Sequence, residues 1–165
     1  MLNLDLVKIA ARRIEDVAVK TPFAYAPLLS AISKAEIYVK KENLQTTGAF
    51  KLRGAFNKVA SLSEEQRAKG VIAASAGNHA QGVAFAAKHF ESQAVIVMPE
   101  STPITKINGV ASYGAEVLLA GSNYDEAYAY ATEYAQKNSL VFIHPFEDDE
   151  VIAGQGTVAL EMLSL

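Results

Sequence analysis

The chain has 165 residues, a formal net charge of −3 and no cysteine. This length suits one domain or a large piece of one, and such a domain buries roughly two thirds of the surface that its unfolded chain exposes. The lack of cysteine excludes disulfides, thiolate metal sites and cysteine nucleophiles. No block of Lys and Arg is present to bind phosphate groups, so nucleic acid is not an expected partner.

The N-terminal residues carry no sign of a targeting segment. Met1 to Asp5 lack the positive start and the apolar run of a signal peptide. The apolar runs along the chain are shorter than the roughly 18 residues that span a bilayer. We therefore expect a cytoplasmic protein with no membrane partner.

Hydrophobic spacing predicts two helices and one strand in the first part of the chain. The expected elements are a helix over 5–19, a strand over 37–40 and a helix over 50–62. Pro22 limits the first helix, because the residue before a proline avoids helical geometry. Ser63 and Gln66 have the spacing of a capping box, which predicts a further short helix that ends at Gly70.

From residue 71 onward, short apolar strands alternate with helices. The expected strands are 71–74, 94–98, 116–119 and 140–143, and the expected helices are 79–90, 105–113 and 122–137. Ser122 and Asp125 predict a capping box for the third of these helices, and Asp148 or Asp149 caps a last helix. This alternation predicts an α/β fold, in which helices cover both faces of a parallel sheet.

The last predicted helix stays apolar up to Ser164 and Leu165 and has neither a capping residue nor a polar tail. A helix with so much apolar surface needs a partner to cover it. We therefore expect this chain to be a truncated piece of a longer protein.

Lys51 is the first candidate for chemistry. It follows a Thr-Thr-Gly turn, begins a predicted helix and comes directly after Phe50. A lysine amine becomes a nucleophile only when its pKa falls, and the positive potential at a helix N-terminus favours that change. Phe50 would then lie against a flat cofactor ring. The alternative is a surface lysine that begins an amphipathic helix with Phe50 in the core, and local composition alone favours this alternative.

Residues 75–82, with the sequence Ser-Ala-Gly-Asn-His-Ala-Gln-Gly, are the second candidate. The loop follows a strand and opens a helix, so its backbone N–H groups point toward a bound anion, and Gly77 permits a tight turn. It is neither a Walker A sequence nor a G-x-G-x-x-G sequence. The alternative is an ordinary turn that Ser75 and Asn78 cap.

The three histidines predict less about chemistry. His79 is a candidate acid or base, although a lone histidine beside a turn more often has a structural role. His89 and His144 are weaker candidates. Three dispersed histidines without i,i+4 spacing predict no metal site.

Five stretches of the chain together resemble the serine/threonine dehydratases, which are fold type II pyridoxal-phosphate enzymes. Residues 41–55 resemble the motif around the cofactor lysine of that family, and residues 75–82 are similar to its asparagine loop. Three further family signatures are matched in the expected order by 98–103, 144–148 and 151–157. The resemblance covers nearly the whole chain, and the motif sequences are most like those of the threonine dehydratases.

The resemblance implies a tryptophan synthase β-like architecture with two domains. Residues 1–52 would begin the large cofactor-binding domain, residues 53–147 would form the small α/β domain, and residues 148–165 would return to the large one. A glycine-rich phosphate loop and a partner for the ring nitrogen would follow beyond residue 165. The complete enzyme would be a homo-oligomer.

The same resemblance implies roles for individual residues. Lys51 would form the Schiff base with pyridoxal 5'-phosphate, Phe50 would pack on the pyridine ring, and Asn78 would hydrogen-bond the ring hydroxyl oxygen. The donors expected to hold the substrate carboxylate are Ser75, Gly77, Asn78, His79 and Ala80.

The implied reaction is dehydration and deamination of L-threonine to 2-oxobutanoate and ammonia, with L-serine as a second substrate that yields pyruvate. Such a lyase belongs to amino-acid metabolism, including isoleucine biosynthesis. A serine racemase is the nearest alternative, but those enzymes carry serine where Ala76 stands, and a methyl group cannot transfer a proton. A β-replacement enzyme and a truncated homologue that binds an amino acid without turnover are the remaining alternatives.

Overall fold

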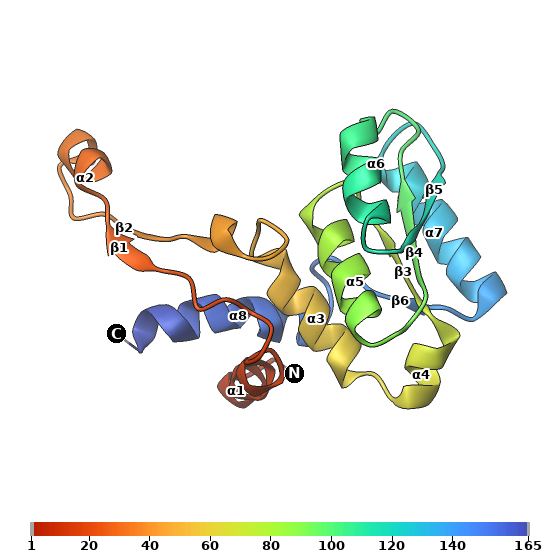
Figure 1. Ribbon diagram of the computed structural model, residues 1–165, viewed down its shortest axis with the longest axis horizontal. Coiled ribbons are helices and arrows are strands. Elements are labelled where there is room, and N and C mark those ends of the chain that lie inside the picture. The colour runs from red at the N-terminus through yellow and green to blue at the C-terminus, as the bar shows by residue number, and fades with distance from the viewer. Residues whose placement is uncertain (1, 165) are drawn as a thin grey trace.

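Residues 71–142 contain the four strands of a parallel sheet in the computed structural model, which describes residues 2–164 (Figure 1). The strands are β3 (Val71–Ala74), β4 (Ala94–Met98), β5 (Glu116–Leu119) and β6 (Val141–Phe142), in the order β5-β4-β3-β6. Every neighbouring pair is parallel, which requires long crossover connections between them. Met1 and Leu165, the outer ends of the predicted domains, lie outside the described residues.

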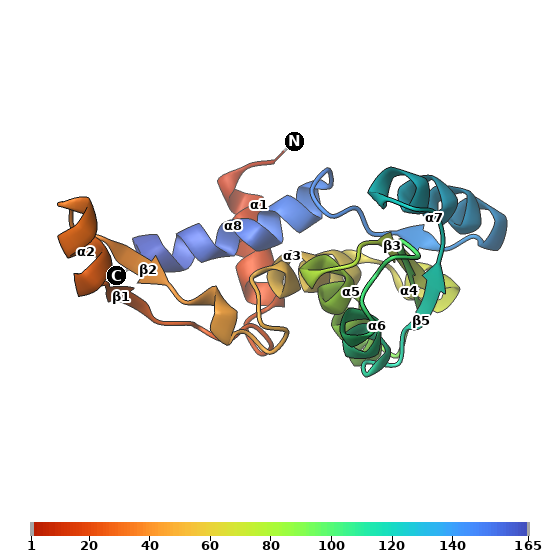
Figure 2. The same cartoon turned by 90° about the horizontal axis from the view of Figure 1, so that it is seen from above.

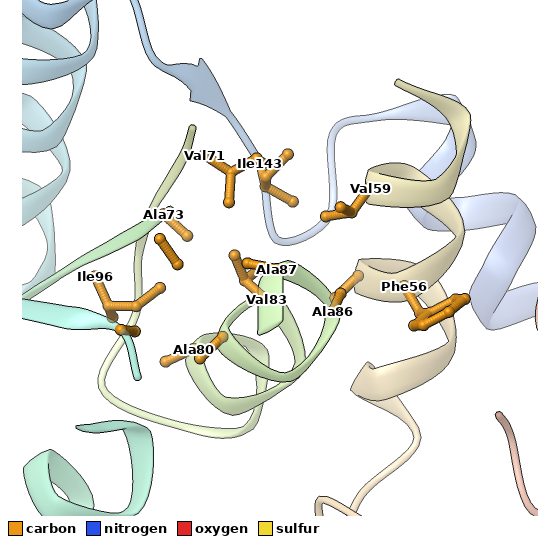
Figure 3. Packing of buried hydrophobic residues seen from close by; sticks show 14 of the residues in the cluster. Phe56, Val59, Val71, Ala73, Ala80, Val83, Ala86, Ala87, Ile96 and Ile143 are labelled. Carbon is orange, nitrogen blue, oxygen red and sulfur yellow. The ribbon is translucent and has the colours of Figure 1, made fainter. Parts of the chain in front are cut away.

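Helices cover both faces of this sheet, as the sequence predicts. The covering helices are α5 (Asn78–His89) and α6 (Ile104–Ala111) on one face and α7 (Tyr124–Asn138) on the other (Figure 1). β3 is buried along its whole length, and its side chains alternate between the two faces. Val71 and Ala73 pack in one cluster with residues of α5 (Figure 3), whereas Ile72 and Ala74 pack in a second cluster with residues of α7.

Helix α3 (Lys51–Ser61) joins this sheet unit to the rest of the chain. It packs against α5 on one side and against α8 (Asp149–Leu163) on the other. Phe56 and Val59 extend from α3 into the same apolar cluster as Ala86 of α5 (Figure 3). The helix that begins at the candidate lysine is therefore held on two sides by other helices.

We expect Gly154→Ala to destabilise the protein by about 1–3 kcal/mol, because it overpacks the crossing of α3 and α8. A Cβ atom at Gly154 would lie 2.6 Å from the carbonyl oxygen of Arg53 and 2.6 Å from Cα of Gly54. Both are backbone atoms, so the two helices would have to separate. Urea unfolding measures the effect.

Gly109→Ala is the matched control for this prediction, because its Cβ would meet only Nε2 of Gln81, at 3.7 Å. Helix propensity favours alanine over glycine by up to about 1 kcal/mol, so the control should be neutral or stabilising. Equal stability of the two variants would contradict the close helix crossing.

The N-terminal part of the chain extends away from the sheet (Figures 1 and 2). Its elements are α1 (Leu4–Arg13), β1 (Phe23–Tyr25), α2 (Pro27–Ser33), β2 (Tyr38–Lys40) and the 3-10 helix η1 (Glu42–Leu44), and α4 (Glu64–Lys69) follows α3. α1 packs against α8, while β1 and β2 form an antiparallel ribbon. Within residues 2–164, no helix combines the length and the apolar character needed to cross a membrane.

Most predicted elements are confirmed. The strands at 71–74, 94–98 and 116–119 have the predicted bounds, the fourth strand is shorter than predicted, and the helices agree to within two residues except the first. Ser63 accepts a hydrogen bond from the Gln66 N–H, and Gln66 returns one to the Ser63 N–H, so the predicted capping box is present. Asp148 caps α8, as one of the two predicted alternatives.

Two predictions are wrong, and three elements were not predicted, among them the 3-10 helix η1. The first helix ends at Arg13 because the N–H groups of Val17 and Ala18 both donate to the Ile14 carbonyl in a tight turn. The Ser122 capping box is absent, since Asn123 caps α7 and the Ser122 N–H donates to the Glu126 carboxylate instead. The short elements β1 and α2 were not predicted from the sequence.

Candidate active site

The Lys51 side chain is half-buried at the first position of α3. Its Nζ donates a hydrogen bond to the carbonyl oxygen of Pro145 at 2.9 Å and forms no ion pair with any other described residue. Burial lowers the pKa of Lys51 below its usual value. The helix N-terminus acts in the same direction, because its positive potential disfavours an ammonium group. Both effects favour the neutral amine over the ammonium.

Phe50, the residue before the lysine, lies at the surface. Its side chain is 41% exposed, and Lys51 Nζ lies 5.6 Å from the centroid of its ring. The alternative in which Phe50 belongs to the core is therefore wrong. An aromatic face beside the amine is open to a ligand.

The 75–78 loop leaves the N-terminus of α5 open. The Ser75 N–H donates to the Val97 carbonyl at the end of β4, and the Ser75 hydroxyl accepts from the Gly77 N–H at 3.2 Å. Gly77 is the N-cap residue of α5 and supplies no side-chain cap, so the helix start differs from the alternative in which Ser75 and Asn78 cap an ordinary turn. A Cβ atom at Gly77 would meet nothing within 4 Å. The free N–H groups of the first turn suit an anion.

A third segment, residues 143–147, closes the site between Lys51 and the 75–78 loop. The Ile143 N–H donates to the Ile72 carbonyl at 2.8 Å, which continues the pairing of β6 with β3. Lys51 binds Pro145 of the same segment, and His79 Nε2 lies 3.0 Å from the Ile143 carbonyl oxygen. The sequence analysis did not predict that this segment contacts Lys51 and His79, although the His-Pro-Phe sequence at 144–146 was part of one of the family signatures.

The structure brings the predicted site residues together around the start of two neighbouring helices. α3 and α5 approach so closely that a Cβ atom at Gly82 would lie 3.1 Å from the Lys51 carbonyl oxygen. Asn78 is exposed at the first position of α5, whereas His79 and Ala80 are buried. The His79 imidazole contacts Ile143, so only its backbone N–H faces the open helix end.

Arg53, two residues after Lys51, is fully buried between two carboxylates. Its guanidinium bonds Glu42 of η1 through Nε at 2.8 Å and through Nη2 at 3.0 Å. It bonds Glu161 of α8 through Nη1 at 2.7 Å and through Nη2 at 3.1 Å. Because Glu42 and Arg53 flank residues 45–50, their ion pair holds both ends of the loop that leads to Lys51.

The charges of this cluster stabilise one another. Burial by itself raises the pKa of Glu42, but hydrogen bonds from Arg53 and Thr21 overcome this effect and hold the pKa below its usual value. Glu161 follows the same pattern, because burial raises its pKa but hydrogen bonds from Arg53 and Lys40 lower it by more, so that its pKa also lies below the usual value. Two cations and two carboxylates therefore form a neutral, partly buried network that sequence reasoning did not predict.

The comparisons with known proteins agree with this site. The model of the pyridoxal-phosphate dependent enzymes matches residues 14–165. The chain belongs to this family. The family resemblance predicted from the motifs is confirmed, and so is the α/β fold that it implied.

Individual relatives match almost all of the chain. An L-threonine ammonia-lyase of Thermotoga maritima is 52% identical over 163 residues, which cover 99% of this chain and 41% of that protein. The structure of threonine deaminase isoform 2 from Solanum lycopersicum has a TM-score of 0.89 at 42% identity and covers 98% of this chain and 46% of its own. The structure of a serine racemase from Dictyostelium discoideum has a TM-score of 0.91 at 38% identity, and the match covers 99% of this chain and 53% of the racemase chain. The chain thus spans about half of the length of such relatives, or less.

The described residues fit pyridoxal phosphate in three respects. Lys51 offers an amine with a lowered pKa that is bonded only to a backbone carbonyl. Phe50 presents an exposed aromatic face within reach of a planar ring bound at that amine. The open space at Gly77 gives the carboxylate of an amino acid, the substrate that such a cofactor would hold, access to the N–H groups at the start of α5. Lys51, Phe50 and Asn78 are the residues that would hold the cofactor.

Proposed function

We propose that this chain is part of a lyase that converts L-threonine to 2-oxobutanoate and ammonia, with L-serine as a second substrate. The observation that carries the proposal is the half-buried Lys51 amine, which lies between the open N-terminus of α5 and the Pro145 carbonyl. The printed names of two relatives, a threonine ammonia-lyase and a threonine deaminase, support threonine as the substrate.

Lys51 has two functions in this proposal. It would hold the cofactor covalently before substrate binds. Once the substrate amine has displaced it, the freed Nζ would accept the proton from the α-carbon of the substrate. The lowered pKa favours the neutral amine that both functions require. When bound, the cofactor supplies a conjugated ring that spreads the negative charge left on the substrate. Phe50 would cover one face of that ring, and Asn78 would hydrogen-bond its hydroxyl oxygen.

The substrate carboxylate binds at the start of α5. The backbone N–H groups of Asn78, His79 and Ala80 occupy the first helical turn, where intrahelical partners are lacking. Gly77 leaves room for the carboxylate, and the Ser75 hydroxyl lies in the same loop. The positive end of the helix dipole adds to the attraction. These groups orient the substrate rather than take part in bond breaking.

The predicted domain organisation belongs to the same proposal. Residues 53–147 would form the small domain, with residues 1–52 and 148–165 in the large one. Lys51 then lies next to the first boundary, and Pro145 next to the second, so the site forms where the two domains meet. A homo-oligomer, a cytoplasmic location and a role in isoleucine biosynthesis remain predictions for the complete protein.

The test is an assay of the longest reading frame that contains this chain, purified with pyridoxal phosphate. We expect 2-oxobutanoate and ammonia in equal amounts from L-threonine, and pyruvate from L-serine. The 165-residue chain is assayed in parallel. Amino-acid binding without any product from the longer protein would overturn the proposal in favour of the non-catalytic homologue.

Serine racemisation is the second candidate, because a serine racemase is among the similar structures. Inversion at the α-carbon needs a second acid on the face of the substrate opposite to Lys51. Ala76 lies in the 75–78 loop and offers only a methyl group, so elimination is favoured. Chiral chromatography of the L-serine reaction separates the two outcomes. D-serine formed as fast as pyruvate would contradict the lyase.

A further inference from the structure

The 143–147 segment connects Lys51 with His79 through two of its backbone carbonyls. His79 Nε2 lies 3.0 Å from the Ile143 carbonyl oxygen, and Lys51 Nζ donates to the Pro145 carbonyl oxygen at 2.9 Å. The Ile143 N–H in turn donates to Ile72 of β3. Pro145, the hydrogen-bond acceptor of Lys51, is therefore two residues from Ile143, which is bonded both to α5 and to the sheet.

Hydrogen bonds within the segment also fix its shape. Nδ1 of His144 accepts hydrogen bonds from the N–H groups of Phe146, at 3.3 Å, and Glu147, at 2.7 Å. These bonds form a tight turn directly around Pro145. Pro145 thus lies inside the turn that His144 forms, two residues after Ile143, where His79 holds the segment.

The contacts of His79 determine its protonation state. A carbonyl oxygen only accepts hydrogen bonds, so Nε2 carries the proton. Nδ1 is buried and has no hydrogen-bond partner among residues 2–164. A second proton on Nδ1 would place an unpaired cationic donor in the interior, which costs more free energy than an unpaired acceptor. The ring is therefore neutral.

The electrostatic surroundings of His79 agree with this geometry. Burial lowers the pKa of His79 to about 4, and although the hydrogen bond to Ile143 opposes this shift, the nearby Lys51 and His144 add to it. A neutral ring at physiological pH cannot act as the proton donor that an imidazolium would be. The predicted role of His79 as a catalytic acid or base is thus not favoured.

We propose that His79 is a positioning residue, whose neutral imidazole fixes the 143–147 segment so that the Pro145 carbonyl holds the Lys51 amine in the site. The importance of this role rests on the proposed function, in which Lys51 is the reacting amine. His79 itself reacts with nothing. It acts through Ile143 and Pro145, and its Nε2–H is the donor on which the arrangement depends.

The first test examines the unmodified chain by ¹⁵N NMR of its histidine rings. We expect His79 to show a protonated Nε2 and an unprotonated Nδ1 from about pH 8 down to about pH 5. His89, which is exposed, serves as the internal reference for a solvent-accessible histidine ring in the same spectra. The opposite tautomer, or an imidazolium at His79 near pH 6, would overturn the proposal. This measurement needs no variant.

The second test measures how fast an amine-specific acylating reagent labels Lys51, by mass spectrometry of the digested chain. His79→Leu removes the donor, so the amine should lose its fixed acceptor and react about fivefold faster, the change that one ordinary hydrogen bond corresponds to. His79→Gln keeps an N–H donor near the Nε2 position and should react like the unmodified chain. His89→Gln is the control away from the site.

Two other lysines in the same digest make the result interpretable. Lys69, with an exposed side chain, corrects for reagent concentration, and Lys40, whose side chain is 7% exposed, reports unfolding. Unchanged labelling of Lys51 in a folded His79→Leu chain would overturn the proposal, as would equal acceleration in His79→Gln. If His79→Leu does not fold, the tautomer of the His79 ring and the labelling rate of Lys51 in His79→Gln test the proposal instead. Neither measurement uses cofactor or turnover, so failure of the proposed function would show separately.

Discussion

Lys51→Ala should lower threonine turnover of the complete, cofactor-loaded protein by about 10³-fold or more, because it removes both the attachment point of the cofactor and the base. The chain offers no substitute at this position, since no other lysine hydrogen-bonds the 143–147 segment among the described residues. The rate of 2-oxobutanoate formation measures the loss. The visible absorption band of the bound cofactor should shift or disappear in the same variant.

Lys88→Ala is the control for this prediction, since Lys88 is exposed in the last turn of α5, far along that helix from Asn78. It should leave turnover within about twofold of the unmodified protein, as surface substitutions usually do. Borohydride reduction followed by mass spectrometry should place the cofactor on Lys51 alone. Turnover that survives in Lys51→Ala, or cofactor mass on another lysine, would contradict the assignment.

Arg53→Ala should destabilise the protein by about 3–5 kcal/mol, which is the cost of leaving buried charges without their partner. Arg53 is fully buried, and its removal leaves the carboxylates of Glu42 and Glu161 with Lys40 as the one cation paired with either of them among residues 2–164. Arg53→Lys keeps the charge but cannot bond both carboxylates bidentately, so an intermediate loss is expected. Urea unfolding followed by circular dichroism measures the free energies.

Lys69→Ala is the matched control for the ion network, because it removes a cation from an exposed i,i+4 pair with Glu65. Such pairs contribute only about 0.3–0.5 kcal/mol. A loss below 1 kcal/mol in Arg53→Ala, comparable to the control, would show that solvent reaches the cluster and compensates the carboxylates.

The same network predicts a loss of stability in acid. The pKa values of Glu42 and Glu161 are lower in the folded chain than their usual value of about 4.3 in an unfolded one. The unfolded state therefore binds protons first as the pH falls. The stabilisation that the two carboxylates provide is complete above the unfolded pKa and is lost as the pH falls through the lower, folded values.

Urea midpoints measured between about pH 7 and pH 3 test this dependence. Glu161→Gln is the informative variant, because it should be less stable at neutral pH and yet lose less stability on acidification than the unmodified chain. A pH dependence equal to that of the unmodified chain would mean that other carboxylates control the acid transition.

The sequence by itself determined the elements whose signals are local. Continuous apolar runs predicted β3 and β4 to the residue, because a strand that is buried on both faces carries apolar side chains up to both of its ends. The Ser63 capping box was readable because both partners lie within one helical turn. The motifs around Lys51 and in the 75–82 loop identified the family from residues that are neighbours in the chain.

Only the tertiary structure decided how these pieces form a site. The acceptor of Lys51 is a backbone carbonyl 94 residues away, and a backbone carbonyl has no signature in the sequence. Arg53 finds one of its two carboxylates 108 residues away in α8, so its burial could not be read from α3 alone. The pattern of neighbouring residues in the sequence indicates local helix and strand preferences. The hydrogen bonds of Lys51 and Arg53 to distant residues follow instead from the packing of α3 between α5 and α8. That packing brings three distant segments together around one amine.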